Sequence, residues 1–520
     1  MVCKNTEDKV VRKGGAPVYT IRLAIQTSEY DNRFFEKCFY YGCAISNMVT
    51  RHANNALASL SCIKEYKIAR EKYGRRYAGK KANELSSEQK AERERLLEIM
   101  NAYQMRYPLT AAALEKYAKK ARRQYTNYLS AHQVQWIADQ AAKSVKAYLY
   151  GSGHQLHFCR NNQFTTIGQK TASDGITFIA WNKIRFMKRI FYLNVPSTPY
   201  IQAVMTQRDK VKVVSLKRIE FNSGWRYYAI ITLDGNPPVL HGKGNDRMGV
   251  DLGMSTLAAE SDSAMMLENL APNAVGYEKK IRHLQNLADH KMRIANPDNY
   301  DSLGRVRKGR QYWKVSKAVK RLRRYIRVLY RKQSAYTKSS HGHLLNRLLS
   351  NSAEIVLEPM LFKRLQKKSK KTERQEKLSA VKKKNGTIIQ VHKYKRKKRF
   401  GHSIKNRSPG LLQSELKRKA ALMHIPVLEI DIMQYRASQL HHDTGEYVKL
   451  GLSERYKTIS GHIVQRDLYS AFLIRHSDTS LCRPDFEACN KDFQHFAEMQ
   501  DALLSEMRAN KVSNIPCWDF

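Results

Sequence analysis

The chain has 520 residues, and 93 Lys and Arg against 46 Asp and Glu give it a formal net charge of +47. A surface this basic repels itself unless it binds a polyanion, so the composition predicts a nucleic-acid partner. The sequence has no apolar run of membrane-spanning length, no basic amphipathic anchor and no secretory leader pattern, which argues against a membrane partner and predicts a cytoplasmic protein. Eight scattered cysteines without a CxxC pair predict reduced thiols.

The first half of the chain is predicted to be a β domain split by a helical insertion. Apolar and polar residues alternate from Tyr19 to Ile25, as in a strand with one buried face. Residues 30–152 carry helical periodicity and end at a Gly-Ser-Gly. Residues 153–243 return to short β-like runs, including two that flank the turn residues Asn222-Ser223-Gly224. Residues 1–29 and 153–243 therefore form one predicted β domain.

The second half is predicted to be an α/β domain over residues 244–433. Short apolar strands, among them MGVDLG, AEIVLE and PVLEID, alternate with two long basic helical stretches between about 275 and 347. Residues 363–400 contain 17 Lys or Arg against two Glu and cannot form a packed core. Two interpretations of this tract stay open: a solvated helix face or mobile loop, and a stable phosphate-binding groove.

Three carboxylates stand at positions suited to a shared site. Asp251 ends the strand in MGVDLG, and Glu358 ends the strand in AEIVLEP, where Pro359 forbids a longer ladder. Asp467 opens the amphipathic helix in RDLYSAFLI. Such hard oxygen ligands suit two Mg²⁺ or Mn²⁺ ions that hydrolyse a phosphodiester. Each acid taken singly could also be an ordinary strand-end or helix-cap residue.

A nucleotide-binding interpretation of GVDLGMST is also possible, because the segment resembles the first phosphate loop of actin-like and sugar-kinase ATPases. Those folds need a second glycine-rich phosphate loop, and none follows residue 261. The strongly basic composition also suits a polymer better than a single nucleotide. We therefore favour the nuclease.

The motifs resemble the transposon-encoded TnpB nucleases and the compact type V CRISPR effectors. GVDLGMST is similar to their first RuvC motif, IVLEPM to the second and QRDLYSAFLI to the third, in the same order. The resemblance implies an RNase H-like (RuvC) nuclease domain preceded by a β-barrel-like wedge domain with an inserted helical recognition domain. It further implies a structured guide RNA, a double-stranded DNA target with a short adjacent motif, and catalysis and metal binding by Asp251, Glu358 and Asp467.

The segment 434–465 departs from the family pattern, and residues 466–520 carry the third motif and the tail. TnpB proteins have a four-cysteine zinc ribbon there, whereas this chain has His441 and Thr444 where cysteines are expected. Only His441, His442 and His462 could replace them, so we expect no structural zinc. Tyr469 and Ser470 also stand where the family usually has Asn and Ala, although Asp467 is kept.

The sequence thus predicts an RNA-guided, metal-dependent DNA endonuclease with one RuvC site. A guide-directed DNA binder or repressor with a dormant nuclease is one alternative. A basic RNA-binding scaffold without catalysis is another. The sequence leaves open whether the guide comes from a transposon end or a CRISPR array, and whether the chain works as a monomer.

Overall fold

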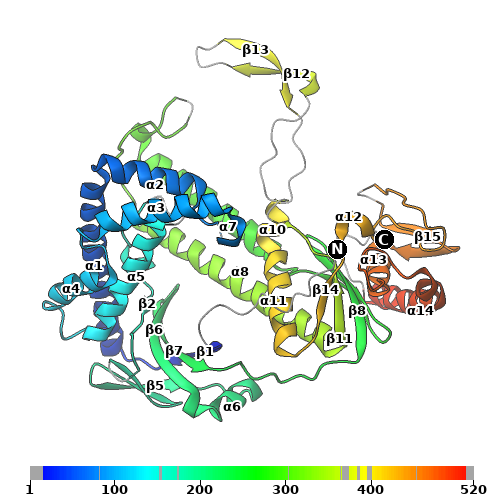
Figure 1. The fold of residues 1–520 in the computed structure, drawn as a ribbon, viewed down its shortest axis with the longest axis horizontal. Helices are drawn as coiled ribbons and strands as arrows, with labels where there is room; N and C mark the ends of the chain where they lie inside the picture. The colour runs from blue at the N-terminus through cyan, green and yellow to red at the C-terminus, as the bar shows by residue number, and fades with distance from the viewer. Residues whose placement is uncertain are drawn as a thin grey trace. The chain divides into compact units, whose positions relative to one another are not determined.

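The computed structural model describes residues 16–80, 82–150, 155–172, 175–302, 304–362, 365, 374–382, 387–394, 401–451 and 454–510. The chain divides into two compact units, and the boundary lies between Pro238 and Val239. Figure 1 labels the helices and strands of both units. Each unit contains helices and a sheet, so the coarse prediction of a mixed α/β protein with several sheets is confirmed. No helix in the described part of the chain is long and apolar enough to cross a bilayer.

The first unit contains a seven-stranded antiparallel sheet of order β2-β6-β7-β1-β5-β4-β3. The predicted hairpin is present, because Phe221 pairs with Gly224 across a two-residue connection. Alternate residues of the first strand are buried, as the sequence predicts. In chain order the strands are β1 (Val18–Ile25), β2 (Thr166–Ile167), β3 (Ile176–Ala180), β4 (Lys183–Phe186), β5 (Arg189–Asn194), β6 (Val211–Phe221) and β7 (Gly224–Asp234).

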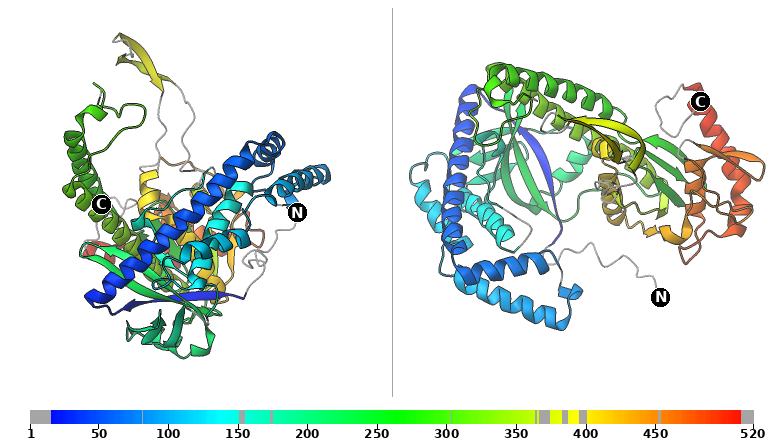
Figure 2. Two further views of the ribbon diagram at one scale, coloured as in Figure 1. Left: turned by 90° about the vertical axis from the view of Figure 1, so that its left-hand side faces the viewer. Right: turned by 90° about the horizontal axis from the view of Figure 1, so that it is seen from above.

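Along the chain, long helices follow β1 and precede β2 (Figure 2). The first one starts at a capping box in which the Asp31 N–H donates to Ser28 Oγ at 3.2 Å and the Ser28 N–H donates to Asp31 Oδ2 at 3.0 Å. Its Phe35 packs against Phe191 and Tyr227 of the sheet. The helices are α1 (Glu29–Ser61), α2 (Lys64–Arg76), α3 (Ser87–Gln104), α4 (Ala111–Arg122) and α5 (Ala131–Tyr150), and a short α6 (Pro199–Met205) follows later. The predicted Gly-Ser-Gly boundary after α5 lies outside the described residues.

The second unit is built around a five-stranded mixed sheet of order β10-β9-β8-β11-β14. The first three strands form an antiparallel meander, and β11 and β14 then extend it in parallel with β8. A parallel neighbour requires a long crossover, which explains the chain length between β8 and β11. The strands are β8 (Asp246–Leu252), β9 (Thr256–Glu260), β10 (Met265–Asn269), β11 (Ser352–Leu357) and β14 (Val427–Glu429).

Helices cover both faces of this sheet, so its strands serve two cores. Val250 packs into one core with residues of α8 and α11, whereas Val356 packs into another with α13 and α14. Both predicted basic helices are present as α7 and α8. The helices are α7 (Ala274–Ala295), α8 (Lys317–Ser350), α10 (Gly401–Arg407), α11 (Pro409–Leu422), α12 (Ile432–Tyr435), α13 (Arg466–Arg475) and α14 (Phe486–Ala509).

The polycationic tract contains a β-hairpin where it is described. β12 (Arg374–Lys382) pairs in antiparallel register with β13 (Ile388–Tyr394). The helix-face or loop interpretation is therefore wrong for these two strands. The sequence of the two strands contains Val381, Ile388, Ile389 and Val391, residue types of high β propensity that a charge pattern alone does not reflect. The remainder of the tract lies outside the described residues.

Gly249 allows α13 to approach β8 closely. A Cβ at this position would lie 2.0 Å from the backbone oxygen of Ala471 and 2.5 Å from the backbone nitrogen of Arg475. Backbone atoms cannot rotate away as a flexible side chain can. The helix and strand can keep their present separation only with glycine at this position.

We expect Gly249→Ala to lower the free energy of unfolding by about 1–3 kcal/mol or more, because the added methyl overpacks a rigid contact. Denaturant unfolding measures the change. Gly276→Ala in α7 is the matched control, because a Cβ there meets nothing within 4 Å, and it should be neutral or stabilising. Equal stability of the two variants would contradict the close-approach argument.

Candidate active site

Asp251 is the penultimate residue of β8. Because side chains alternate along a strand, Asp251 and Gly249 lie on the same face of the sheet. That face is covered by α13. The pKa of Asp251 is raised well above its usual range, first by burial and then by the nearby charges of Glu358 and Asp467. Arg466 acts in the opposite direction and lowers it. An ionised acid buried beside two other acids lowers the stability of the fold, so a purely structural role does not explain the arrangement.

Glu358 follows directly after β11, which pairs in parallel with β8. Its backbone N–H donates to the Val250 carbonyl oxygen at 3.2 Å, which fixes it beside Asp251. Leu357 pairs with Val250 in the same ladder. Burial raises the pKa of Glu358 above its usual value. The parallel register therefore delivers two carboxylates to one edge of the sheet.

Asp467 stands in the first turn of α13. Gln465 caps this helix, because its side-chain oxygen accepts the Leu468 N–H at 2.7 Å, and the Gln465 N–H in turn donates to Gln500 on α14 at 2.7 Å. The Asp467 side chain is 17% exposed, and Oδ1 lies 3.3 Å from Arg466 Nε. The helix terminus thus presents a third carboxylate together with a cation.

The structure brings Glu358 and Asp467 close enough to Asp251 for their charges to raise its pKa. Within the residues described, however, no group of three or more His, Cys, Asp or Glu side chains is arranged closely enough to hold a metal ion. The donor chemistry still fits Mg²⁺ or Mn²⁺, because all three side chains offer hard carboxylate oxygens. A bound cation would relieve the repulsion that Glu358 and Asp467 exert on ionised Asp251.

Comparisons with known proteins return no matching family model and no matching curated protein. Among solved structures, a chain of the Cas12f1–sgRNA–target DNA complex is similar at 12% identity and a TM-score of 0.39, over 88% of this chain and 99% of that one. A chain of a CRISPR–Cas12f ternary complex is similar at 11% identity and a TM-score of 0.25, over 87% and 98%.

Side chains in the segment 434–465 join it to α13 and α14. The hydroxyl of Tyr469 lies 2.7 Å from His442 Nδ1 and also accepts the His442 backbone N–H at 3.0 Å. The imidazole packs against Phe493, with ring centres 4.9 Å apart. Lys457 Nζ lies 4.6 Å from the centre of the Tyr469 ring. His442 therefore has a packing role here, and Tyr469, which departs from the family pattern, supplies its partner.

We expect the His442 contact to make the protein less stable in mild acid. Burial lowers the pKa of His442 from 6.5 to about 4, so the folded state holds the neutral ring while the unfolded chain takes up a proton below pH 6.5. Its stabilising contribution is present above pH 6.5 and is lost as the pH falls towards 4, by up to about 3 kcal/mol. Denaturant unfolding of wild type and His442→Gln across this range should give a shallower pH slope for the variant. Parallel slopes would refute the assignment.

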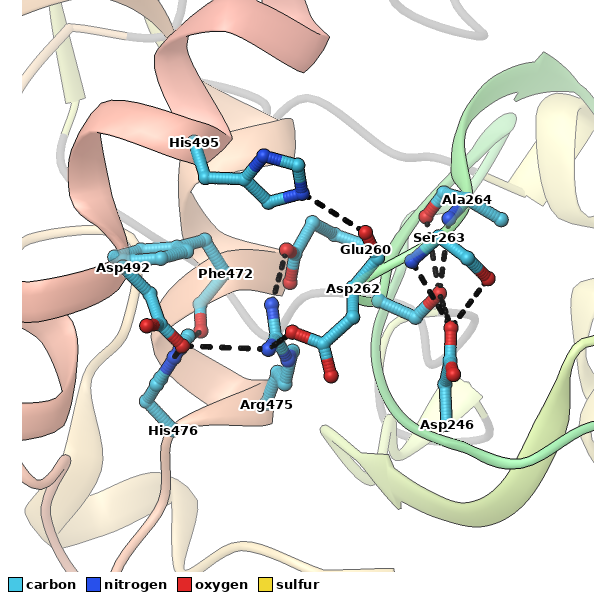
Figure 3. Close-up of polar contacts among 11 residues, drawn as sticks. Asp246, Glu260, Asp262, Ser263, Ala264, Phe472, Arg475, His476, Asp492 and His495 are labelled. Atoms are coloured by element: carbon cyan, nitrogen blue, oxygen red, sulfur yellow. Dashed lines mark hydrogen bonds and ion pairs between the residues drawn. The ribbon is translucent and has the colours of Figure 1, made fainter.

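An ion-pair network holds the C-terminal end of α13 against its neighbours (Figure 3). Arg475 Nη1 lies 2.7 Å from Glu260 Oε1, and its Nη2 contacts Asp262 and Asp492. Arg475 and Glu260 side chains are 7% and 0% exposed. Burial raises the pKa of Glu260 to about 7, although Arg475 opposes the rise. His476 Nε2 lies 3.0 Å from Asp492, so the network links β9, α13 and α14.

Sequence reasoning missed the charged residues around the acids. Arg466 could have been found, because it directly precedes Asp467 in the third motif. The Glu260–Arg475 pair could not, because 215 positions separate its members and only the packing of α13 on the sheet joins them. The Tyr469–His442 contact was equally hidden, since a tyrosine on a helix is more often a core residue than a partner for a histidine.

Proposed function

We propose that this protein is an RNA-guided, divalent-metal-dependent DNA endonuclease. It would hydrolyse phosphodiester bonds of guide-matched DNA at one RuvC-type site made of Asp251, Glu358 and Asp467. The observation that carries the proposal is that Glu358 and Asp467, each in its predicted motif, lie near enough to buried Asp251 to raise its pKa, and that burial also raises the pKa of Glu358. Perturbed acids of this kind are concentrated at functional sites.

The architecture of the second unit supports an RNase H-like domain. Its central sheet has an antiparallel meander extended by two parallel strands, and helices cover both faces. Asp251 and Glu358 lie at the ends of the two central parallel strands. In open α/β sheets this carboxyl edge is where binding sites form.

The chain's own residues would act by holding and orienting the reacting groups. Bound Mg²⁺ or Mn²⁺ would activate water and stabilise the leaving oxygen. The three acids would supply its ligands, and each must be ionised to do so. Arg466 favours the ionised form of Asp251, because its positive charge lowers the pKa of that carboxyl. The positive charge of +47 would hold guide RNA and target DNA by their phosphates.

A dormant nuclease that only binds DNA is a second candidate. It is favoured by the loose arrangement of the acids, since no three-ligand group is found among the described side chains. Metal binding decides between the two. Mg²⁺ that raises the melting temperature of wild type but not of Asp251→Ala would support the nuclease, because a ligand stabilises only the form that binds it.

The RNA that co-purifies with the protein tests the guide directly. Sequencing it should yield a defined scaffold with a variable segment, and the complex should then cut DNA that matches this segment in Mg²⁺ but not in chelator. Recovery of heterogeneous cellular RNA and no matched cleavage would refute the proposal. Matched binding without cleavage would establish the second candidate.

A further inference from the structure

A cavity of about 790 Å³ in the first unit combines aromatic and cationic walls. It lies beside the N-terminal part of α1, and residues of β5, β6 and β7 line its other side. Its volume falls in the range of small-ligand sites. The aromatic lining residues are Tyr30, Phe34, Tyr40, Tyr128 and Trp225.

Two of these aromatic side chains are left outside the core. Tyr30 is 66% exposed and Tyr40 is 57% exposed. A large exposed ring beside a cavity offers a face on which a flat ligand can stack. Aromatic platforms of this kind hold unstacked bases in single-stranded nucleic-acid sites, and they do so for any base.

The cations of the cavity lie on its aromatic walls. Arg189 Cζ is 4.3 Å from the centre of the Phe34 ring, and its Nη2 donates to Tyr30 Oη at 3.1 Å. Arg33 and Lys37 on the exposed side of α1 line the same space. These guanidinium and ammonium groups are the side chains that neutralise phosphate oxygens.

Arg218 is the most unusual member of the lining. It is only 1% exposed, and its guanidinium lies 4.3 Å from the centre of the Trp225 ring. Its Nε donates to the Phe164 carbonyl oxygen at 3.0 Å and its Nη2 to Asn161 Oδ1 at 2.8 Å. Among the described residues no carboxylate forms an ion pair with it. Its positive charge therefore lies in the wall of the cavity, held by neutral acceptors and by the charge of the nearby Glu36 carboxylate.

We infer that this cavity binds one unpaired nucleotide of an RNA strand, with the base against the tyrosines and the phosphate on the cations. A paired base is stacked within its helix and cannot enter a pocket without being extruded. The Glu36 carboxylate also lines the cavity. It can accept a hydrogen bond from a ribose 2′-hydroxyl, which DNA lacks. The strand's identity as guide RNA rests on the proposed function, whereas nucleotide binding rests on the cavity.

A short uridine-rich RNA carrying one 2-aminopurine tests the inference, because uridines stack weakly and leave the probe fluorescent before binding. Stacking quenches this fluorescent base, so the full-length protein should quench it, and Tyr40→Leu should weaken the quenched complex about tenfold. Tyr192→Leu is the matched control, because Tyr192 in the same unit is also 57% exposed but does not line the cavity. We expect less than a twofold change there.

A second pair of variants separates the cavity from general charge. Arg189→Ala should weaken the quenched complex about tenfold. Arg226→Ala is the control: it removes an equal charge from another Arg–aromatic contact, in which the guanidinium lies 4.5 Å from the centre of the Phe221 ring. It should weaken binding only by the salt-dependent share of the affinity that any surface cation contributes. Equal losses in the two variants, or no quenching by wild type, would overturn the nucleotide site. Equally tight binding of the DNA version would overturn the assignment to RNA.

The measurement is made in chelator and repeated with Asp251→Ala. Both conditions abolish any metal-dependent cleavage, so failure of the cavity inference and failure of the proposed nuclease give different results. Thermal unfolding of each variant confirms that it is folded. Tyr40→Leu is a mild change in this respect, because more than half of the tyrosine side chain is already in solvent.

Discussion

Asp251→Ala, Glu358→Ala and Asp467→Ala should each lower the rate of guide-directed DNA cleavage by roughly a thousandfold or more. Losing one ligand forfeits several kcal/mol of transition-state stabilisation in a metal-dependent hydrolysis. Target binding should remain within about twofold of wild type, because it depends on base pairing and on phosphate contacts elsewhere. Cleavage of matched DNA in Mg²⁺, with binding measured in chelator, gives both quantities.

Stability provides a second test of the same variants. Burial and two like charges raise the pKa of Asp251, so its ionised form opposes folding when no metal is bound. Asp251→Ala should therefore not lower the melting temperature in chelator. Glu429→Gln is the control for cleavage, because Glu429 ends the neighbouring parallel strand but pairs with Lys417. A triad variant that cuts at the wild-type rate would remove that residue from the site.

Arg475→Met should destabilise the second unit by about 3–5 kcal/mol near pH 8, because it leaves the Glu260 carboxylate buried without its partner. The loss should shrink towards pH 6. The pKa of Glu260 is already raised to about 7, and protonation removes the charge that needs Arg475. Denaturant unfolding at the two pH values measures the difference.

Two further variants isolate the buried pair. Glu260→Gln combined with Arg475→Met should recover part of the lost stability, since the fully buried Glu260 carboxylate is then no longer left unpaired, while Asp262 and Asp492 are partly in solvent. Arg483→Met removes an ion pair with Asp478 whose arginine is 75% exposed, and it should cost less than about 1 kcal/mol. Equal destabilisation by Arg475→Met and Arg483→Met would show that burial of the network contributes nothing.

Local sequence patterns predicted the strands and the helix that carry the candidate site, but not which of these elements are neighbours in the fold. The strands ending near Asp251 and Glu358 and the helix starting near Asp467 follow from apolar runs, Pro359 and amphipathic spacing. That β8 and β11 are parallel neighbours depends on a crossover of many residues, which periodicity cannot specify. In the basic tract the charge pattern indicated no regular structure, yet β12 and β13 pair as an antiparallel hairpin.

Helix α13 is a short, rigid element that is held against the sheet away from its N-terminal end. Its contact with β8 lies where Gly249 meets the backbone of Ala471 and Arg475, in the C-terminal half of the helix, while Asp467 stands at the N-terminal end. Four residues of helix span about 6 Å, so a tilt of only about 5° at that pivot displaces the Asp467 end by about 0.5 Å. Catalytic constellations tolerate roughly that much error. A substitution that shifts α13 near Arg475 would therefore also displace the Asp467 carboxylate, so the end of the helix farthest from the acids bears on the geometry of the proposed site.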